Sequence, residues 1–119
     1  MYYRIIHVQL VYIKQNNLSM CSITIHYMKL PDFKVLHSTN MTSGGNYRET
    51  DIDVAVFKHR HDEAIYKRIE EQHNHINGEP NILTINLYRS EAEPMKGTRP
   101  YTTIYIDYDS GTREIRNKQ

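Results

Sequence analysis

Apolar and polar residues alternate along much of this chain, and that pattern constrains the fold more than any other feature. Ten tyrosines, no tryptophan and many isoleucines and threonines favour strands, because aromatic and branched side chains suit a pleated, half-buried surface. In 51–61, Ile52 and Val54 share one face of the predicted strand, and Ala55 and Phe57 share the other. The same pattern predicts five strands, over 2–14, 20–30, 51–61, 81–88 and 101–107.

One segment has helical periodicity instead. Asp62 is the predicted N-cap, and Asn77-Gly78 ends the helix after about position 76. Apolar and histidine side chains repeat at four-residue spacing between them, at Ile65, Ile69 and His73. Residues 31–50 are polar and contain Gly44-Gly45, so we expect a long mobile loop there. The predicted fold is α+β, a largely antiparallel five-stranded sheet with the helix packed on one face and the other face free to hold a substrate.

Length and charge narrow the class of protein. A chain of 119 residues predicts a single domain over 1–119 with a modest core, whose stability can depend on a partner subunit. Fifteen Lys and Arg against fourteen Asp and Glu leave a formal charge of +1, so a nucleic-acid-binding surface would have to be local. Cys21 is the only cysteine, which excludes an internal disulfide. With no signal-peptide pattern and no apolar run long enough for a membrane span, we expect an intracellular, soluble protein.

The triplet His59-Arg60-His61 is the strongest candidate for a metal site. Residues two apart on a strand lie on the same face, so both imidazoles can converge on one divalent cation at roughly 2.1 Å. The alternative is a polar strand end with solvated side chains. Asp51 and Asp53 have the same strand parity and are candidates for an unassigned third ligand, although they lie six to eight residues from His59.

Two other histidine pairs are weaker candidates. His73 and His75 point about 200° apart on a helix and cannot share a metal there. His7 and Gln9 share a strand face and could form a substitute site, but a polar gap in the strand is the simpler interpretation.

Tyr108 is the candidate catalytic residue. Tyr105 and Tyr108 are three apart and so lie on opposite faces of a strand, which means that only one can serve a given site. Tyr108 precedes the turn Asp109-Ser110-Gly111, which would leave its hydroxyl accessible, whereas Tyr105 lies inside the strand. A metal held by two histidines, together with a tyrosine that can attack, indicates phosphodiester cleavage through a covalent tyrosine intermediate.

His59, His61 and Tyr108 give the chain a resemblance to the HUH endonucleases, the rolling-circle replication initiator (Rep) proteins of viruses and plasmids. It is most similar to the small single-tyrosine Rep proteins of the rudiviruses, which infect archaea. The resemblance implies a ferredoxin-like fold and a replication initiator that nicks DNA at a specific site through a 5′-phosphotyrosine bond and then rejoins strands. Arg60 stands where the family usually has a hydrophobic residue.

The resemblance also implies a cofactor and partners. His59 and His61 would bind Mn²⁺ or Mg²⁺, with Mn²⁺ better suited to imidazole ligands. The substrate would be single-stranded or hairpin DNA in the cytoplasm of a host cell, and a homodimer would supply two tyrosines. Two alternatives stay open: a non-catalytic nucleic-acid-binding regulator on a similar fold, and an interaction protein that dimerises through an edge strand. Basic residues near the triplet could contact DNA phosphates or merely balance nearby carboxylates.

Overall fold

The structure, a computed structural model, describes residues 3–15, 18–29, 31–58 and 62–117. The contacts between residues divide the chain into two compact units, residues 1–31 and residues 32–119. Each unit has its own sheet, with two strands in the first and five in the second.

The first unit is an antiparallel pair of strands, β1 (Tyr3–Gln15) and β2 (Leu18–Lys29). Val8 lies opposite Ile25 and Tyr12 lies opposite Cys21, and the register shifts between Ile5 and His7. The strands predicted over 2–14 and 20–30 are therefore confirmed. They pair with each other and are not members of the five-stranded sheet.

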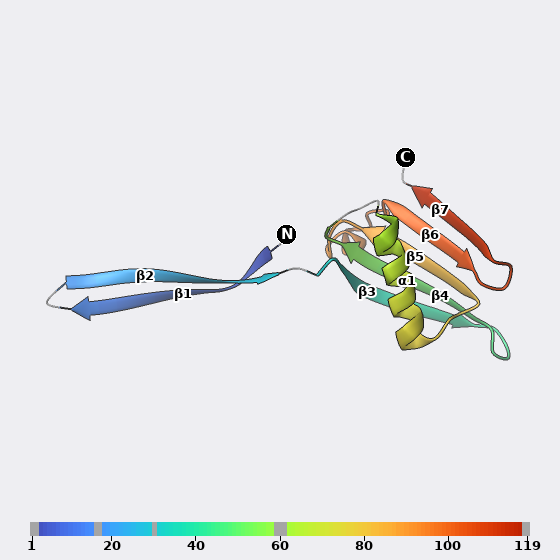
Figure 1. The fold of residues 1–119 in the computed structure, drawn as a ribbon, viewed down its shortest axis with the longest axis horizontal. Coiled ribbons are helices and arrows are strands. Elements are labelled where there is room, and N and C mark those ends of the chain that lie inside the picture. The colour runs from blue at the N-terminus through green and yellow to red at the C-terminus, as the bar shows by residue number, and fades with distance from the viewer. Residues whose placement is uncertain (1–2, 16–17, 30, 59–61, 118–119) are drawn as a thin grey trace. The chain divides into compact units, whose positions relative to one another are not determined.

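The second unit contains one sheet and one long helix (Figure 1). Its elements are β3 (Phe33–Thr42), β4 (Arg48–Val56), α1 (Glu63–Asn77), β5 (Ile82–Tyr88), the short 3-10 helix η1 (Pro94–Lys96), β6 (Thr102–Asp107) and β7 (Thr112–Asn117). The strand order β3-β4-β5-β6-β7 follows the chain. Among the described strands, only β4 and β5 pair in parallel, because α1 carries the chain back between them. The predicted α+β fold, with a mostly antiparallel five-stranded sheet and one helix, is confirmed.

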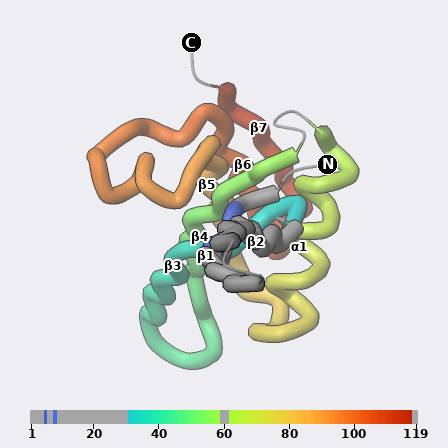
Figure 2. Tube along the Cα trace, turned by 90° about the vertical axis from the view of Figure 1, so that its left-hand side faces the viewer, coloured from blue at the N-terminus to red at the C-terminus, as the bar shows by residue number. Residues whose placement is uncertain are grey.

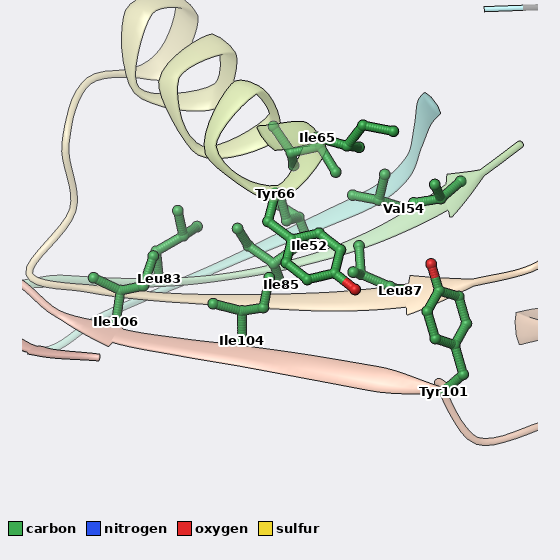
Figure 3. Packing of buried hydrophobic residues seen from close by; sticks show 12 residues of the cluster. Ile52, Val54, Ile65, Tyr66, Leu83, Ile85, Leu87, Tyr101, Ile104 and Ile106 are labelled. Atoms are coloured by element: carbon green, nitrogen blue, oxygen red, sulfur yellow. The ribbon is translucent and has the colours of Figure 1, made fainter. Parts of the chain in front are cut away.

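The core lies between α1 and one face of this sheet (Figure 3). Alternation along β4, β5 and β6 places every second side chain on the helix side, and their pairing aligns Ile52, Ile85 and Ile104 across three strands. The helix contributes Ile65, Tyr66 and Ile69 to the same cluster. The apolar residues that alternate in the sequence are thus the ones that pack between the sheet and α1.

Both ends of α1 match the sequence prediction. The side chain of Asp62 accepts a hydrogen bond from the backbone N–H of Ala64 at 2.9 Å, as an N-cap does. At the other end Gly78 has a positive φ of 82°, and its N–H donates to the carbonyl of Asn74 at 2.9 Å. No helix among the described residues is long and apolar enough to cross a membrane.

Two predicted element boundaries are wrong, and the structure adds a strand that the sequence pattern does not predict. The expected mobile loop over 31–50 is largely β3, which pairs along its length with β4 and leaves only a short turn around Gly44 and Gly45. The strand predicted over 51–61 begins earlier, at Arg48, and ends at Val56. The segment that follows Gly111 forms β7, an exposed edge strand. The connection between β5 and β6, orange in Figure 2, is a long loop that projects from the sheet.

Candidate functional site

Tyr108 follows the last residue of β6 and continues the alternation of that strand. Ile104 and Ile106 lie on the helix side, so the side chain of Tyr108 also turns toward α1, where it packs against the core cluster while staying partly exposed. Its backbone N–H donates to the carbonyl of Asn81 at 2.9 Å. The end of β6 and Asn81, the residue before β5, therefore fix the position of the Tyr108 side chain.

Two residues of α1 bind the Tyr108 hydroxyl. Oη donates to Oε1 of Glu70 at 2.8 Å and accepts a hydrogen bond from Nδ2 of Asn74, also at 2.8 Å. Glu70 and Asn74 are four residues apart, so they lie one above the other on the same side of the helix. The phenol is thus held between a carboxylate and an amide.

The cluster extends in two directions from these residues. Arg113 of β7 donates from Nη1 to Oε2 of Glu70 at 2.7 Å, and the arginine side chain is 42% exposed against 15% for the glutamate. Oδ1 of Asn74 lies 2.9 Å from Nδ1 of His73, a buried residue. We call His73, Asn74, Glu70, Tyr108 and Arg113 the Tyr108 cluster.

The surroundings of Tyr108 favour the neutral phenol. Burial is the largest cause and raises its pKa above the usual value near 10; the hydrogen bond to the Glu70 carboxylate raises it further, while the bond from Asn74 opposes the shift. At neutral pH very little phenolate is present. A reaction at this oxygen therefore requires removal of its proton.

A groove borders the cluster between α1 and β7. Its volume is about 620 Å³, and Glu70 and Arg113 both line it. The other lining residues continue along the helix to its first turn: Glu63, Ala64, Tyr66, Lys67, Glu71 and, from β7, Ile115. The groove thus runs from the partners of Tyr108 to the beginning of α1.

His59, Arg60 and His61 lie outside the described residues. Asp62, the next residue, is the N-cap of α1 and precedes Glu70 by eight residues and Asn74 by twelve. These two partners of Tyr108 therefore lie about 12 to 18 Å along the axis from the start of the helix. Among the residues that the structure describes, no group of three His, Cys, Asp or Glu could hold a metal ion.

Asp51 and Asp53 lie on the sheet face opposite α1, so the structure does not bring these candidate ligands to Tyr108. Nδ2 of Asn86 donates to both carboxylates, at 2.7 Å to Asp51 and 3.1 Å to Asp53, and Thr103 donates to Oδ1 of Asn86 at 3.2 Å. Desolvation and then the charge of Asp53 raise the pKa of Asp51. The two aspartates belong to a separate polar network.

The structure places two further predicted pairs, Tyr105 with Tyr108 and His73 with His75. Tyr105 lies on the face opposite Tyr108, as predicted, in a hollow of about 330 Å³ that Asp51 also lines. His73 is buried and His75 is exposed on an intact helix, which agrees with the expectation that the two side chains point in different directions. The side chains of His7 and Gln9 lie outside what the structure describes.

Sequence reasoning did not identify Glu70 and Asn74 as partners of Tyr108. The available signal was their four-residue spacing, directly after the buried Ile69 and His73, which places them beside the packed stripe of the helix. Comparison with protein-family models, with curated proteins and with solved structures found no match to this chain.

Proposed function

We propose that this protein is a metal-dependent, site-specific DNA nickase that initiates replication in the cytoplasm of a host cell. It would cut one strand by forming a covalent 5′-phosphotyrosine bond at Tyr108, release a 3′ hydroxyl, and reverse the reaction to join strands. Its substrate would be single-stranded or hairpin DNA, because the attacked strand must be accessible.

One observation carries this proposal. The Tyr108 hydroxyl belongs to a polar cluster with the exposed guanidinium of Arg113, at the border of a groove on the protein surface. A phosphodiester carries a negative charge that repels nucleophiles, so a cation beside the attacking oxygen favours the approach of the phosphate. Arg113 can bind a phosphate oxygen through guanidinium donors that Glu70 does not use.

A divalent cation would add to this charge. His59 and His61 would hold it, with Mn²⁺ or Mg²⁺ as candidates, and when bound it would neutralise phosphate oxygens. The described residues do not themselves assemble a metal site, since Asp51 and Asp53 are held by Asn86 on the other face of the sheet. The described residues that would carry out the cleavage are therefore Tyr108 and its contacts.

A homodimer is part of the proposal, since cutting and rejoining are easier with two tyrosines. A two-fold axis would place one Tyr108 cluster from each copy in the same assembly. Light scattering at working concentration measures this directly, and a monomer mass would remove the dimer from the proposal.

Covalent trapping tests the nickase. We would incubate the full chain with a labelled, randomised pool of single-stranded DNA and with hairpin DNA, in Mn²⁺ or Mg²⁺, and resolve the products on a denaturing gel. A protein–DNA adduct should form with wild type and be lost in Tyr108→Phe. Tyr105→Phe is the matched control, because Tyr105 lies in β6, the strand that Tyr108 follows, with its side chain on the opposite face. The Tyr105→Phe protein should still form the adduct.

A second candidate is a DNA-binding regulator that does not cut. The observation that favours it is the environment of Tyr108, whose hydroxyl is satisfied by two hydrogen bonds and whose pKa is raised, as in a structural tyrosine. Retardation of DNA on a native gel with no adduct under any of these conditions would support this function and overturn the nickase.

A further inference from the structure

We infer that Glu70 is the general base of the proposed cleavage, taking the hydroxyl proton of Tyr108 as its oxygen attacks phosphorus. The inference rests on the proposed function, because Glu70 can act in this way only where Tyr108 is the nucleophile.

The hydrogen bonds around the phenol fix the direction of its proton. Asn74 donates from Nδ2 to Oη, so this contact uses a lone pair of the phenol oxygen and cannot receive its hydrogen. Glu70 accepts at 2.8 Å, well within the distance for direct proton transfer. The hydroxyl hydrogen therefore lies on the line between Oη and Oε1.

Both helical partners are themselves held in place. His73 is buried with Nδ1 2.9 Å from Oδ1 of Asn74, and donation from that nitrogen keeps the amide nitrogen turned toward Tyr108. Arg113 holds Oε2 of Glu70 at 2.7 Å, which leaves Oε1 to the phenol. A nucleophile bound to a base, with the base oriented by a third residue, is the arrangement that activates weak nucleophiles.

The Tyr108 environment creates the need for such a base. Burial raises the pKa of the phenol, so spontaneous ionisation at neutral pH provides almost no nucleophile. A carboxylate already in contact can instead remove the proton during attack. Glu71, the next residue, carries the same charge in the same groove, but it pairs with Lys67 at 3.9 Å and is not bonded to Tyr108.

Tyr108, Glu70, the DNA strand and water together account for every bond and proton in the step. The Oη–H bond breaks and its proton moves to Oε1 of Glu70, while Oη forms a bond to phosphorus and the bond from phosphorus to the 3′ oxygen breaks. The leaving 3′ oxygen takes a proton from water, and Glu70 returns its proton to solvent. One phosphodiester bond is exchanged for another, so the reverse reaction can rejoin the strand.

The pH dependence of adduct formation separates a base from a residue that only positions Tyr108. We would measure the single-turnover rate with the labelled single-stranded pool for wild type, Glu70→Gln and Glu71→Gln, from about pH 6 to about pH 9.5. Near pH 7 Glu70→Gln should be slower by about 10²- to 10⁴-fold, and the deficit should narrow as pH rises, because hydroxide then removes the proton. Glu71→Gln should keep the pH dependence of wild type, because it removes a charge from the groove but no contact to Tyr108.

Other results of this experiment would overturn either the role of Glu70 or the proposed function. A Glu70→Gln rate equal to wild type, or lower by the same factor at every pH, overturns the general base and leaves the nickase intact. Glu70→Asp adds a check, because it retains the carboxylate and should recover part of the rate lost in Glu70→Gln. No adduct with wild type would overturn the proposed function, and the role of Glu70 with it.

Discussion

The carboxylate of Glu70 lies 2.8 Å from the hydroxyl of Tyr108, although 38 residues separate them in the chain. The contact joins the middle of α1 to the end of β6, and Arg113 extends it to β7. The helix and a strand pair that is distant from it in sequence therefore determine the chemistry of one oxygen, and the pKa of that oxygen can be measured.

The ionisation of Tyr108 should respond to Glu70. Because the hydrogen bond and the charge of this carboxylate raise the phenol pKa, Glu70→Gln should lower it toward 10, although burial keeps part of the shift. An ultraviolet titration of each protein, minus that of its Tyr108→Phe counterpart, isolates this one phenol among ten tyrosines. An unchanged pKa in Glu70→Gln would mean that the contact is not formed in solution.

The contribution of Tyr108 to the stability of the fold should fall at alkaline pH. Its folded-state pKa is above that of the unfolded chain, so the protonated phenol stabilises the fold fully below pH 10, and this contribution is lost as pH rises through the folded-state value. Below pH 10, Tyr108→Phe should cost about 1 kcal/mol through the lost hydrogen bonds. Urea unfolding at increasing pH should show the difference from wild type shrinking. A difference that stays constant would contradict the raised pKa.

Asp51 should be mildly destabilising when ionised. Desolvation and the neighbouring Asp53 raise its pKa in the folded state, so the stability present below the unfolded value near 4 is lost as pH rises through the folded one. At pH 7 Asp51→Asn should therefore be more stable than wild type, by at most about 0.5 kcal/mol because the residue is exposed. Urea midpoints at pH 7 and pH 3 test this, with Glu71→Gln as control. A gain of equal size at both values would rule out the electrostatic cause.

Gly78 should tolerate substitution poorly. It ends α1 at φ 82° and ψ 154°, a conformation that is nearly confined to glycine, so Gly78→Ala should cost about 1 to 3 kcal/mol. An added Cβ would lie 3.8 Å from Nη2 of Arg48, an ordinary contact, so the cost should come from the backbone alone. Gly97, at φ 74° and ψ 15°, is left-handed, and Gly97→Ala should cost less, about 1 kcal/mol. Thermal unfolding of the two variants compares these costs. An equal loss of stability in both would contradict the prediction that the Gly78 backbone conformation is the more costly for alanine.

A mixing experiment tests the predicted roles of the histidines and of the dimer together. In the proposed dimer, the candidate metal ligands and the candidate nucleophile can come from different copies, and two variants that each lack one of them then complement each other. Neither Tyr108→Phe nor a size-tagged His59→Ala/His61→Ala protein should form an adduct alone. Their mixture should form one on the tagged copy, which retains Tyr108. If wild type reacts and the mixture does not, the residues act within one chain.

The parts of the fold that the sequence predicts are those with one buried face. Ile52 and Val54 on β4, like Ile65 and Ile69 on α1, alternate with polar residues at the period of their element because they pack together. The helix boundaries follow from local hydrogen bonds, which involve only Asp62 and Gly78 and their neighbours in sequence.

The missed strands lack that signal. Val35 and Met41 on β3 are exposed, and every residue of β7 is exposed, because these are the two edges of the sheet. Backbone pairing alone forms such strands, and it leaves no hydrophobic alternation in the sequence. The separation of β1 and β2 from the five-stranded sheet has no sequence signal either, because the alternation predicts a strand but not the strand with which it pairs.

The candidate site also has one part that the sequence predicts and one part that it does not. The side of β6 on which Tyr108 lies follows from strand parity, which is a local property. Its contact with Glu70 and the contact of Glu70 with Arg113 could not be predicted, because they depend on how α1 crosses the sheet and on the existence of β7. In the sequence both residues are ordinary surface charges.

The strand order of the five-stranded sheet also has a consequence for how the protein is made. Each strand pairs with its neighbour in the chain, so the sheet can grow from β3 onward without threading a segment between strands already formed. The hydrophobic core is complete once β6 has been added, but Arg113 arrives only with β7. During synthesis we therefore expect the fold to mature before the Tyr108 cluster does, so that a nascent chain is stable before it acquires its full set of charged groups.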